Sequence, residues 1–358
     1  MPSLKEIKGR INSISSTLAI TSAMKMVAAA KLQKAQMAIQ NMLPYERRLY
    51  SMLVDLMGAM NISAAASEDG SVRGSGSAER GFDQSGDRLS LSNRHDLAGM
   101  DGAYSLMAQR EVRKVAIVAF ASNSSLCGAF NSNVIREATA VINEYRASGL
   151  GDADITVYSV GRKMAEAMKK LGFPSPADFT KMSDSPSYEA ASALAQELLD
   201  GFVSGRFDKV ELVYNHYKST SSQPTTRQTY LPLSLADAIA DLQAGKIADS
   251  ASESDTNRGA EPVGAPVVRQ GSPTTEDLIV EPSKEALIAI LLPKVIRLRI
   301  FTTLLDSAAA EHAARTVAMQ LATDNGNDLL QELTLEYNKG RQQKITSEIL
   351  DLVGGSMQ

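Results

Sequence analysis

The fold is decided by the C-terminal segment Ser283–Gly355, which reads SKEALIAILLPKVIRLRIFTTLLDSAAAEHAARTVAMQLATDNGNDLLQELTLEYNKGRQQKITSEILDLVGG. Its apolar residues recur at helical spacing, and it holds almost no helix breakers. A single helix of this length would extend for roughly 100 Å, several times the radius of a small domain. Such a helix needs a partner along its length, so the segment predicts a rod rather than part of an ordinary core.

Signals within this segment define its start and two possible interruptions. Pro282 and Ser283 suit a helix start. Pro293 predicts a bend, because proline removes one helical hydrogen bond. The run Asp324–Asp328 is typical of a turn, and the residues alone leave a break and a continuous helix equally open. The apolar stripe is carried by Leu287, Leu291, Val295, Leu298, Leu305, Leu330, Leu333 and Tyr337.

The N-terminal segment matches it. Ser3 followed by Glu6 is a capping-box pattern at a helix start. A small slip of register after Leu18 rotates the stripe, and Pro44 is a possible kink. The pattern predicts one helix of about 55 residues that ends near Gly58. Its stripe consists of Leu4, Ile7, Ile11, Ile14, Leu18, Met24, Ala28, Leu32, Ala35, Ile39, Met42, Leu49, Met52, Leu53 and Leu56.

Two long striped helices at opposite ends of the chain most simply pair as an antiparallel coiled coil. The alternative is that they are two ordinary helices of a helical bundle. Small residues favour the slender rod, because they let two helix backbones approach closely. These are Ala28, Ala29, Ala30, Ala308, Ala309, Ala310, Ala313 and Ala314.

Composition limits the class of protein. The chain has 358 residues, enough for two domains, and a formal net charge of −4, which argues against a general nucleic-acid binder. A single cysteine, Cys127, excludes an internal disulfide and indicates a reducing compartment. No apolar run reaches the roughly 18 residues of a membrane-spanning helix. The first residues lack the apolar core of a signal peptide.

The middle of the chain contains two segments that are poor in large apolar residues, Ser63–Ala103 and Ala248–Thr275. Neither can bury enough apolar surface to offset its ordering entropy, so both are interpreted as insertions. The predicted organisation is a shaft helix at 1–60, an insertion at 61–112, an α/β domain at 113–235, an insertion at 236–276 and a second shaft helix at 277–358.

Strands alternate with helices between the two insertions, which predicts a small sheet of Rossmann type with helices on its faces. The fourth strand is expected to run antiparallel to the third. The predicted strands are 114–120, 154–158, 210–214 and 225–231, and the predicted helices are 131–148, 162–171 and 188–202.

No nucleotide, metal or catalytic site is predicted in this domain. The loop Ala121–Gly128 lies where a phosphate loop would, but it lacks both glycine-rich phosphate-binding patterns, which favours a tight strand-to-helix turn. Cys127 is interpreted as a small buried residue rather than a nucleophile. The three histidines, His95, His216 and His312, show no metal-ligand spacing.

Four segments are together specific for one family. The chain resembles the γ subunit of F-type ATP synthases at Ile20–Leu32, Ser125–Gly128, Ala322–Gly326 and Tyr337–Ile349, the last followed by Val353-Gly354-Gly355. The match covers both predicted long helices and the α/β core in the right order. The resemblance implies that the C-terminal helix runs unbroken through Asp324–Asp328 and that the central domain binds no nucleotide.

The resemblance implies a non-catalytic rotor without a cofactor. In that family the subunit is a central shaft that turns inside a ring of α and β subunits, and its foot rests on the membrane c-ring beside the small ε subunit. The shaft couples rotation of the membrane ring to conformational change in the catalytic β subunits. The implied location is peripheral, on the cytoplasmic face of a bacterial inner membrane. An organellar location is disfavoured because no transit peptide precedes the first helix.

The resemblance also assigns roles to residues. Arg341, Gln342 and Thr346 are implied to contact β-subunit loops, with Met24 and Lys25 packed nearby. The alternative to a subunit contact is that the lysines and arginines of these helices form a face exposed to solvent. The apolar tail, Ile349, Leu352 and Val353, is implied to turn in an apolar sleeve. The candidate foot is the turn from His216 to Gln223, with His216, Tyr217, Ser221 and Gln223 as the residues that meet the ring.

Two departures from the family are expected to matter. Gly340 replaces a small helix former, which costs about 1 kcal/mol and softens this turn of the helix. Cys127 stands alone, so the chain is expected to lack the cysteine-pair redox switch of chloroplast relatives. On the residues alone, two other functions remain open: a nucleotide-dependent α/β enzyme and a generic coiled-coil scaffold.

Overall fold

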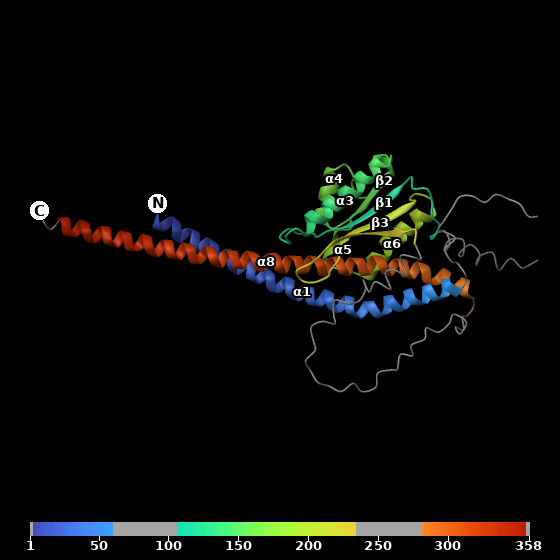
Figure 1. The fold of residues 1–358 in the computed structure, drawn as a ribbon, viewed down its shortest axis with the longest axis horizontal. Coiled ribbons are helices and arrows are strands. Elements are labelled where there is room, and N and C mark those ends of the chain that lie inside the picture. Colours follow the sequence, from blue (N-terminus) through green and yellow to red (C-terminus); the bar gives the residue numbers. More distant parts are fainter. Residues whose placement is uncertain (1–2, 60–105, 234–280, 282, 356–358) are drawn as a thin grey trace, which may run out of the picture.

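The computed structural model describes residues 3–59, 106–233, 281 and 283–355. Two long helices dominate it: α1 spans Leu4–Ala59 with 56 residues, and α8 spans Lys284–Gly355 with 72 residues. They lie side by side, and a central α/β region packs on one side of them (Figure 1). The two expected insertions, Ser63–Ala103 and Ala248–Thr275, lie outside the described residues.

The two helices run in opposite directions, with both chain termini at the same end of the rod (Figure 1). Thr323 Oγ1 donates to Thr21 Oγ1 at 3.1 Å, and Thr302 Oγ1 donates to Glu46 Oε1 at 3.0 Å. Residues early in α1 therefore face residues late in α8. The predicted antiparallel pair is confirmed.

Serine caps begin both helices. The backbone N–H of Glu6 donates to Ser3 Oγ at 3.2 Å, and that of Ala286 donates to Ser283 Oγ at 3.1 Å. Each serine satisfies one N–H group that the first helical turn leaves without a partner. Both interior prolines are accommodated, since α1 continues past Pro44 and α8 past Pro293.

The run Asp324–Asp328 is helical, so the continuous helix is confirmed and the turn interpretation is wrong. Every residue of the two predicted apolar stripes is buried or half-buried. Full burial of one large apolar side chain stabilises by about 1.5–3 kcal/mol. Packing summed along the rod therefore outweighs the local preference of a few turn-forming residues.

The central region contains a four-stranded sheet with the order β2-β1-β3-β4. Strands β1, β2 and β3 are parallel, and β4 pairs antiparallel to β3, as predicted. Their bounds are β1 Val115–Phe120, β2 Ile155–Val160, β3 Lys209–Asn215 and β4 Thr225–Leu231.

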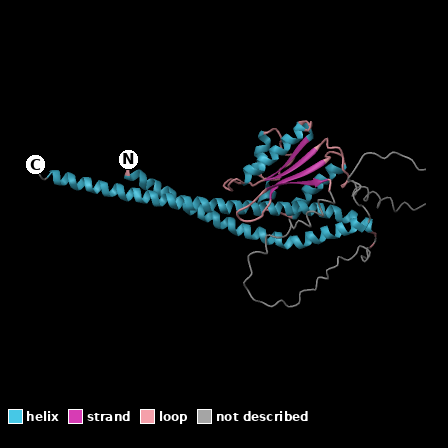
Figure 2. Cartoon of the chain, in the orientation of Figure 1, coloured by secondary structure: helices cyan, strands magenta, loops and turns pink. Residues whose placement is uncertain are grey.

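Alternate residues of the strands enter two different cores, because successive side chains point to opposite faces of a sheet. One core packs the sheet against α3 (Phe130–Ala147) and α4 (Arg162–Lys170). The other packs it against α6 (Tyr188–Val203), the first half of α8 and the end of α1. The layers are visible in Figure 2. The rod thus covers one face of the sheet, and the central region is fixed to it along that face.

Some features of this region were not predicted. A short helix, α5, spans Thr180–Asp184, and a single 3-10 turn spans Asp152–Asp154. Leu106, assigned to the first insertion, is buried in the core, and its carbonyl accepts a hydrogen bond from the Leu233 N–H at 3.0 Å. None of the helices in the described part of the chain is both long enough and apolar enough to cross a membrane.

Candidate functional site: the two-helix rod

The turn between β1 and α3, where a phosphate loop would lie, is closed by its own side chains. Asn131 Oδ1 accepts from the Ser122 N–H at 3.0 Å, and Asn131 Nδ2 donates to Cys127 Sγ at 3.1 Å. Leu126 and Gly128 close the turn with φ values of +68° and +59°. Cys127 is 1% exposed. Its interpretation as a small buried residue of a tight turn is confirmed.

The described residues contain no group of His, Cys, Asp or Glu side chains placed to hold a metal ion. His216 Nδ1 lies 2.6 Å from Asp306 Oδ2. His312 lies in the rod. Burial, together with the positive charges of Lys31 and Arg315, lowers the pKa of His312 to about 4. The imidazole of His312 is therefore neutral at physiological pH. His95 lies outside the described residues.

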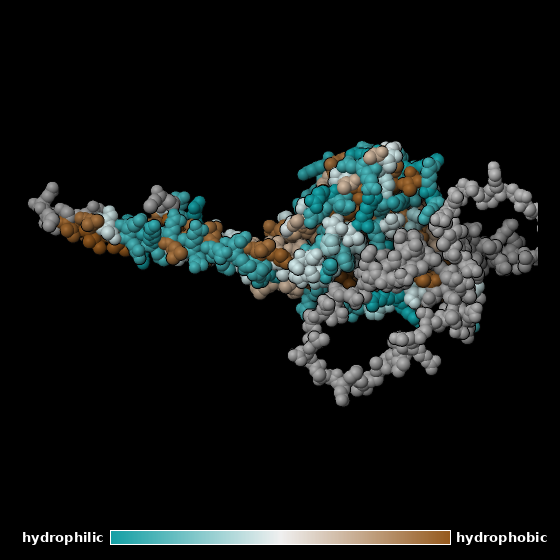
Figure 3. Space-filling view, viewed as in Figure 1, coloured by the Kyte–Doolittle hydropathy of each residue, from teal (hydrophilic) through white to brown (hydrophobic). Residues whose placement is uncertain are grey.

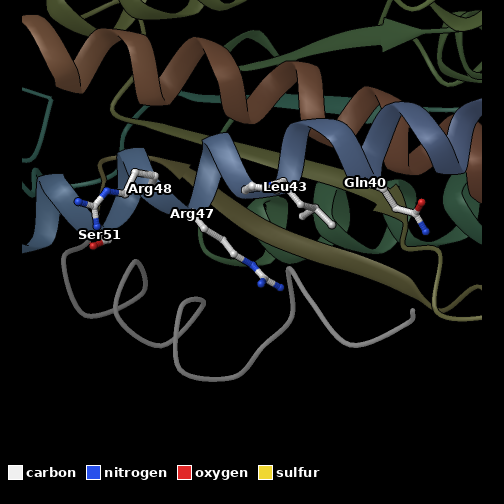
Figure 4. A pocket seen from close by; sticks show the side chains of 6 residues that line it. Gln40, Leu43, Arg47, Arg48 and Ser51 are labelled. Carbon is white, nitrogen blue, oxygen red and sulfur yellow. The ribbon is translucent and has the colours of Figure 1, made fainter. Parts of the chain in front are cut away.

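An open hollow lies on the side of α1. It is lined by Gln40, Leu43, Pro44, Arg47, Arg48 and Ser51 (Figure 4). All six residues come from one helix. A cofactor pocket needs groups that converge from several elements, so this hollow gives no sign of one.

The predicted β-subunit contacts fall at two separate levels of the rod. Lys25 Nζ donates to Gln320 Oε1 at 2.8 Å, so Lys25 and its neighbour Met24 lie opposite residue 320 of α8. Gly340 lies beside Leu4, since a Cβ on Gly340 would be 3.1 Å from Leu4 Cδ2. With a rise of about 1.5 Å per residue, residues 320 and 341 are roughly 30 Å apart along α8.

The expectation that Met24 and Lys25 pack near Arg341 is therefore wrong. Antiparallel pairing places the first residues of α1 beside Gly340, so Arg341 lies just past the start of α1. Arg341, Gln342 and Thr346 are all exposed. Thr346 Oγ1 donates to the Gln342 carbonyl at 2.9 Å, within the helix.

The tip of α8 extends past α1 as a single helix (Figure 1). Its apolar side chains face solvent: Ile349 is 55% exposed, Leu352 75% and Val353 51%. They form the apolar end of the rod in Figure 3, which follows a largely hydrophilic stretch. Apolar side chains exposed at the end of a rod are typical of a contact surface.

The predicted foot, the β3–β4 turn from His216 to Gln223, is held against the rod at its base. The backbone N–H of Tyr217 donates to Asp306 Oδ1 at 2.9 Å, next to the His216–Asp306 contact. Gln223 Nε2 donates to two carbonyls of the turn itself, at 2.6 and 2.9 Å, and Ser221 is exposed. The turn, yellow in Figure 1, lies at the end of the central region nearer to the chain termini.

The comparisons with known proteins decide the family. The family model described as ATP synthase matches residues 3–357. An ATP synthase gamma chain from Phocaeicola vulgatus is 47% identical over 357 residues and is covered completely, as is this chain. The gamma chain from Bacteroides thetaiotaomicron is 45% identical over 358 residues, again with complete coverage of both.

The chain belongs to the ATP synthase gamma chain family. The resemblance seen in the sequence is confirmed. A chain in the Euglena gracilis mitochondrial ATP synthase OSCP/F1/c-ring structure has the same fold, with 19% identity and a TM-score of 0.52 over 99% of this chain and 93% of that one. Gamma chains form the central rotor stalk of ATP synthase and are non-catalytic subunits, and this is the role of the protein. The enzyme and scaffold readings are thereby rejected.

Gly340, which is expected to depart from the family pattern, lies at a contact between the helices. Its hydrogen atoms face Leu4 near the start of α1. A glycine here leaves room for the Leu4 side chain, besides lowering helix propensity.

Sequence reasoning missed Asp306, the α8 residue that binds the turn. One signal was available. Asp306 is the only charged side chain in the run Phe301–Ala310, FTTLLDSAAA. A charged residue within a buried stretch is paired in most proteins, so a partner for it could have been predicted.

Proposed function

We propose that the protein is the shaft of a bacterial ATP synthase, with α1 and the paired part of α8 inside a ring of α and β subunits. The observation that carries this proposal is the single-helix tip of α8, whose apolar side chains project past the start of α1. Ile349, Leu352 and Val353 would turn in an apolar sleeve of the head, where contacts without directional bonds permit rotation.

The coupling between rotation of the rod and nucleotide affinity follows from thermodynamic linkage. Chemically identical catalytic subunits can differ in nucleotide affinity only if an asymmetric object lies between them. A two-helix rod presents a different face to each subunit, so each rod angle favours a different set of conformations. A shift of a two-state equilibrium from 1:99 to 99:1 needs about 5.5 kcal/mol, which a few charge-assisted hydrogen bonds of about 1.5–3 kcal/mol each supply.

The β-subunit contacts would lie at two levels. Arg341, Gln342 and Thr346 form the upper level near the tip, and Met24 with Lys25 forms the lower one. Exposure of the first three side chains supports the upper level. At the lower level Lys25 already donates to Gln320, so this lysine would present a fixed rather than a mobile charge.

At the other end, the ε subunit and the c-ring would bind the central region, with the complex on the cytoplasmic face of the inner membrane. Of the four candidate foot residues, His216, Tyr217, Ser221 and Gln223, Ser221 is the exposed one. The turn lies toward the chain termini, a position that favours a contact with the head subunits over one with the ring. Cross-linking from Ser221 decides the matter: a product with the c subunit supports the foot, and products with α or β alone exclude it.

Arg341→Ala tests the proposed function. We expect it to lower proton-driven ATP synthesis in membrane vesicles that contain the assembled complex. Lys339→Ala is the matched control, because it removes the same charge two residues away, on the opposite side of the helix. Unchanged synthesis with Arg341→Ala, or an equal loss with both variants, would count against the contact.

A further inference from the structure

Tyr217, at the base of the β3–β4 turn, contacts both rod helices. Its ring packs with Leu32 of α1 and with Ala309 and Ala313 of α8. Its hydroxyl accepts a hydrogen bond from Gln36 Nε2 of α1 at 2.6 Å. One side chain of the central region thereby joins three elements.

Asp306 supplies a second anchor at the same place. Its side chain is 18% exposed, and both of its carboxylate oxygens are used. Oδ1 accepts from the Tyr217 N–H at 2.9 Å, and Oδ2 lies 2.6 Å from His216 Nδ1. Two bonds from one carboxylate fix an orientation as well as a position, which a single contact cannot do.

The support beneath these anchors is rigid. Asn215 Nδ2 donates to the Phe130 carbonyl at 3.0 Å, and Asn215 Oδ1 accepts from Thr225 Oγ1 at 2.7 Å. The His216 N–H donates to the Pro224 carbonyl at 2.9 Å. The turn is therefore tied to α3 and closed at its base before it reaches the rod.

The alanine run of α8 makes room for this contact. Ala309 and Ala313 are fully buried beside Leu32, and Ala310 is fully buried beside Cys127 and Phe130. Tyr217 packs against both groups. The small residues that were expected to bring α1 and α8 together therefore also let the central region reach the rod.

We propose that Tyr217 and Asp306 form a joint that fixes the angle of the central region on the rod, so that torque reaches α1 and α8 together. The two are positioning residues, and the inference rests on the proposed rotor function. Torque applied to the central region loads its contacts with the rod. A half-buried contact that binds both helices through directional hydrogen bonds resists slippage of the region around α8 better than apolar packing alone.

The test measures twist within the assembled complex. The α and β head is fixed to a surface, and a bead is attached to the central region through Lys169→Cys, at an exposed position of α4. We compare the angular variance of the stalled bead for the parent complex, Tyr217→Phe, Asp306→Ala and both together. Tyr217→Phe keeps the ring and removes only the hydroxyl. The double variant should raise the variance above that of the parent complex and above that of either single variant, because it removes both directional contacts of the joint.

Two controls separate this role from general stability. Asp306→Asn retains an acceptor for the Tyr217 N–H and should restore most of the stiffness lost with Asp306→Ala. Arg136→Ala, on the exposed side of α3, should leave the variance unchanged. Amide exchange at Tyr217 should rise about five-fold with Asp306→Ala, the contribution of one net hydrogen bond.

Angular variance equal to that of the parent complex in Tyr217→Phe and Asp306→Ala would overturn the joint. If Asp306→Ala fails to assemble, Tyr217→Phe still decides, because it preserves the packing. Failure of the parent complex to rotate with ATP would reject the proposed function instead, so the two failures are distinguishable.

Discussion

Gly326 of α8 faces Leu18 of α1 so closely that a Cβ on the glycine would lie 2.6 Å from Leu18 Cδ2. The glycine lets the two backbones approach at the level where the sequence is typical of a turn. The segment Asp324–Asp328 is helical, and its glycine makes a contact with the partner helix that local preferences do not contain.

Three glycines of the rod predict a graded series of stability changes on replacement by alanine. A Cβ added to Gly9 would meet no atom within 4 Å, so Gly9→Ala should stabilise by up to about 1 kcal/mol, the difference in helix propensity. A Cβ added to Gly340 would lie 3.1 Å from Leu4 Cδ2. Gly340→Ala should therefore leave the unfolding free energy nearly unchanged. Gly326→Ala should destabilise by about 1 kcal/mol, because overpacking of about 1–3 kcal/mol exceeds the gain in propensity.

Urea unfolding followed by far-UV circular dichroism measures this order. Leu18→Ala in the Gly326→Ala background should recover the loss that comes from the clash, as a coupling between the two sites. Stabilisation by Gly326→Ala equal to that of Gly9→Ala would contradict the close approach of the helices.

Replacement of Glu211 in β3 by alanine is expected to lower the stability of the protein. Its side chain is 2% exposed, and Lys209 Nζ, Arg227 Nε and the Tyr145 hydroxyl lie 2.6–2.7 Å from its carboxylate. Burial alone would raise the pKa of Glu211, but the hydrogen bonds from Arg227, Lys209 and Tyr145 hold it below its ordinary value. Glu211→Ala would remove the carboxylate that pairs with Lys209 and would leave Arg227 paired with Glu144 alone, so it should cost about 3 kcal/mol in unfolding free energy.

Glu144 provides the matched control. It pairs with the same arginine, Arg227, but its side chain is 64% exposed. Glu144→Ala should change stability by at most about 1 kcal/mol. Similar losses for the two variants in the same urea titration would mean that burial does not set the strength of this network.

The lowered pKa of His312 predicts that the protein loses stability in acid. Its pKa is lowered by burial and by the charges of Lys31 and Arg315, from 6.5 to about 4. Between these values the unfolded chain binds a proton that the folded chain does not, so stability is complete above pH 6.5 and falls as the pH is lowered toward 4. The loss should be about 2 kcal/mol after discounting for partial exposure.

Urea midpoints across this pH range, for the parent protein and for His312→Gln, measure the effect. Burial raises the pKa of the adjacent Glu311, which acts with the opposite sign, so the difference between the two proteins at each pH isolates the histidine. Midpoints that fall in parallel for both would show that His312 is not the group that titrates.

The sequence was sufficient for the rod and the order of its elements, because a stripe such as Leu4, Ile7 and Ile11 is local information. The fourth strand, 225–231, was predicted with its observed bounds. The sequence failed to predict contacts between residues that lie far apart in the chain. The sequence alone predicts Met24 and Lys25 near Arg341, whereas the pairing register places Lys25 at Gln320 and Leu4 at Gly340.

The contacts of the β3–β4 turn were out of reach for the same reason. A turn of polar residues such as His216–Gln223 is typical of an exposed loop, and nothing near it in sequence indicates Asp306 or Gln36. The roles of Arg341, Gln342 and Thr346 stay predictions, because they depend on other subunits.

The central claim is that α1 and α8 are wound together and turn as one body. The most direct test is the double variant Thr21→Cys and Thr323→Cys, since the two hydroxyls lie 3.1 Å apart. Cys127 is buried and should not compete. We predict that mild oxidation of the assembled complex forms a cross-link within the chain and leaves proton-driven ATP synthesis intact. Failure to form the cross-link, or loss of synthesis that reduction restores, would contradict the account.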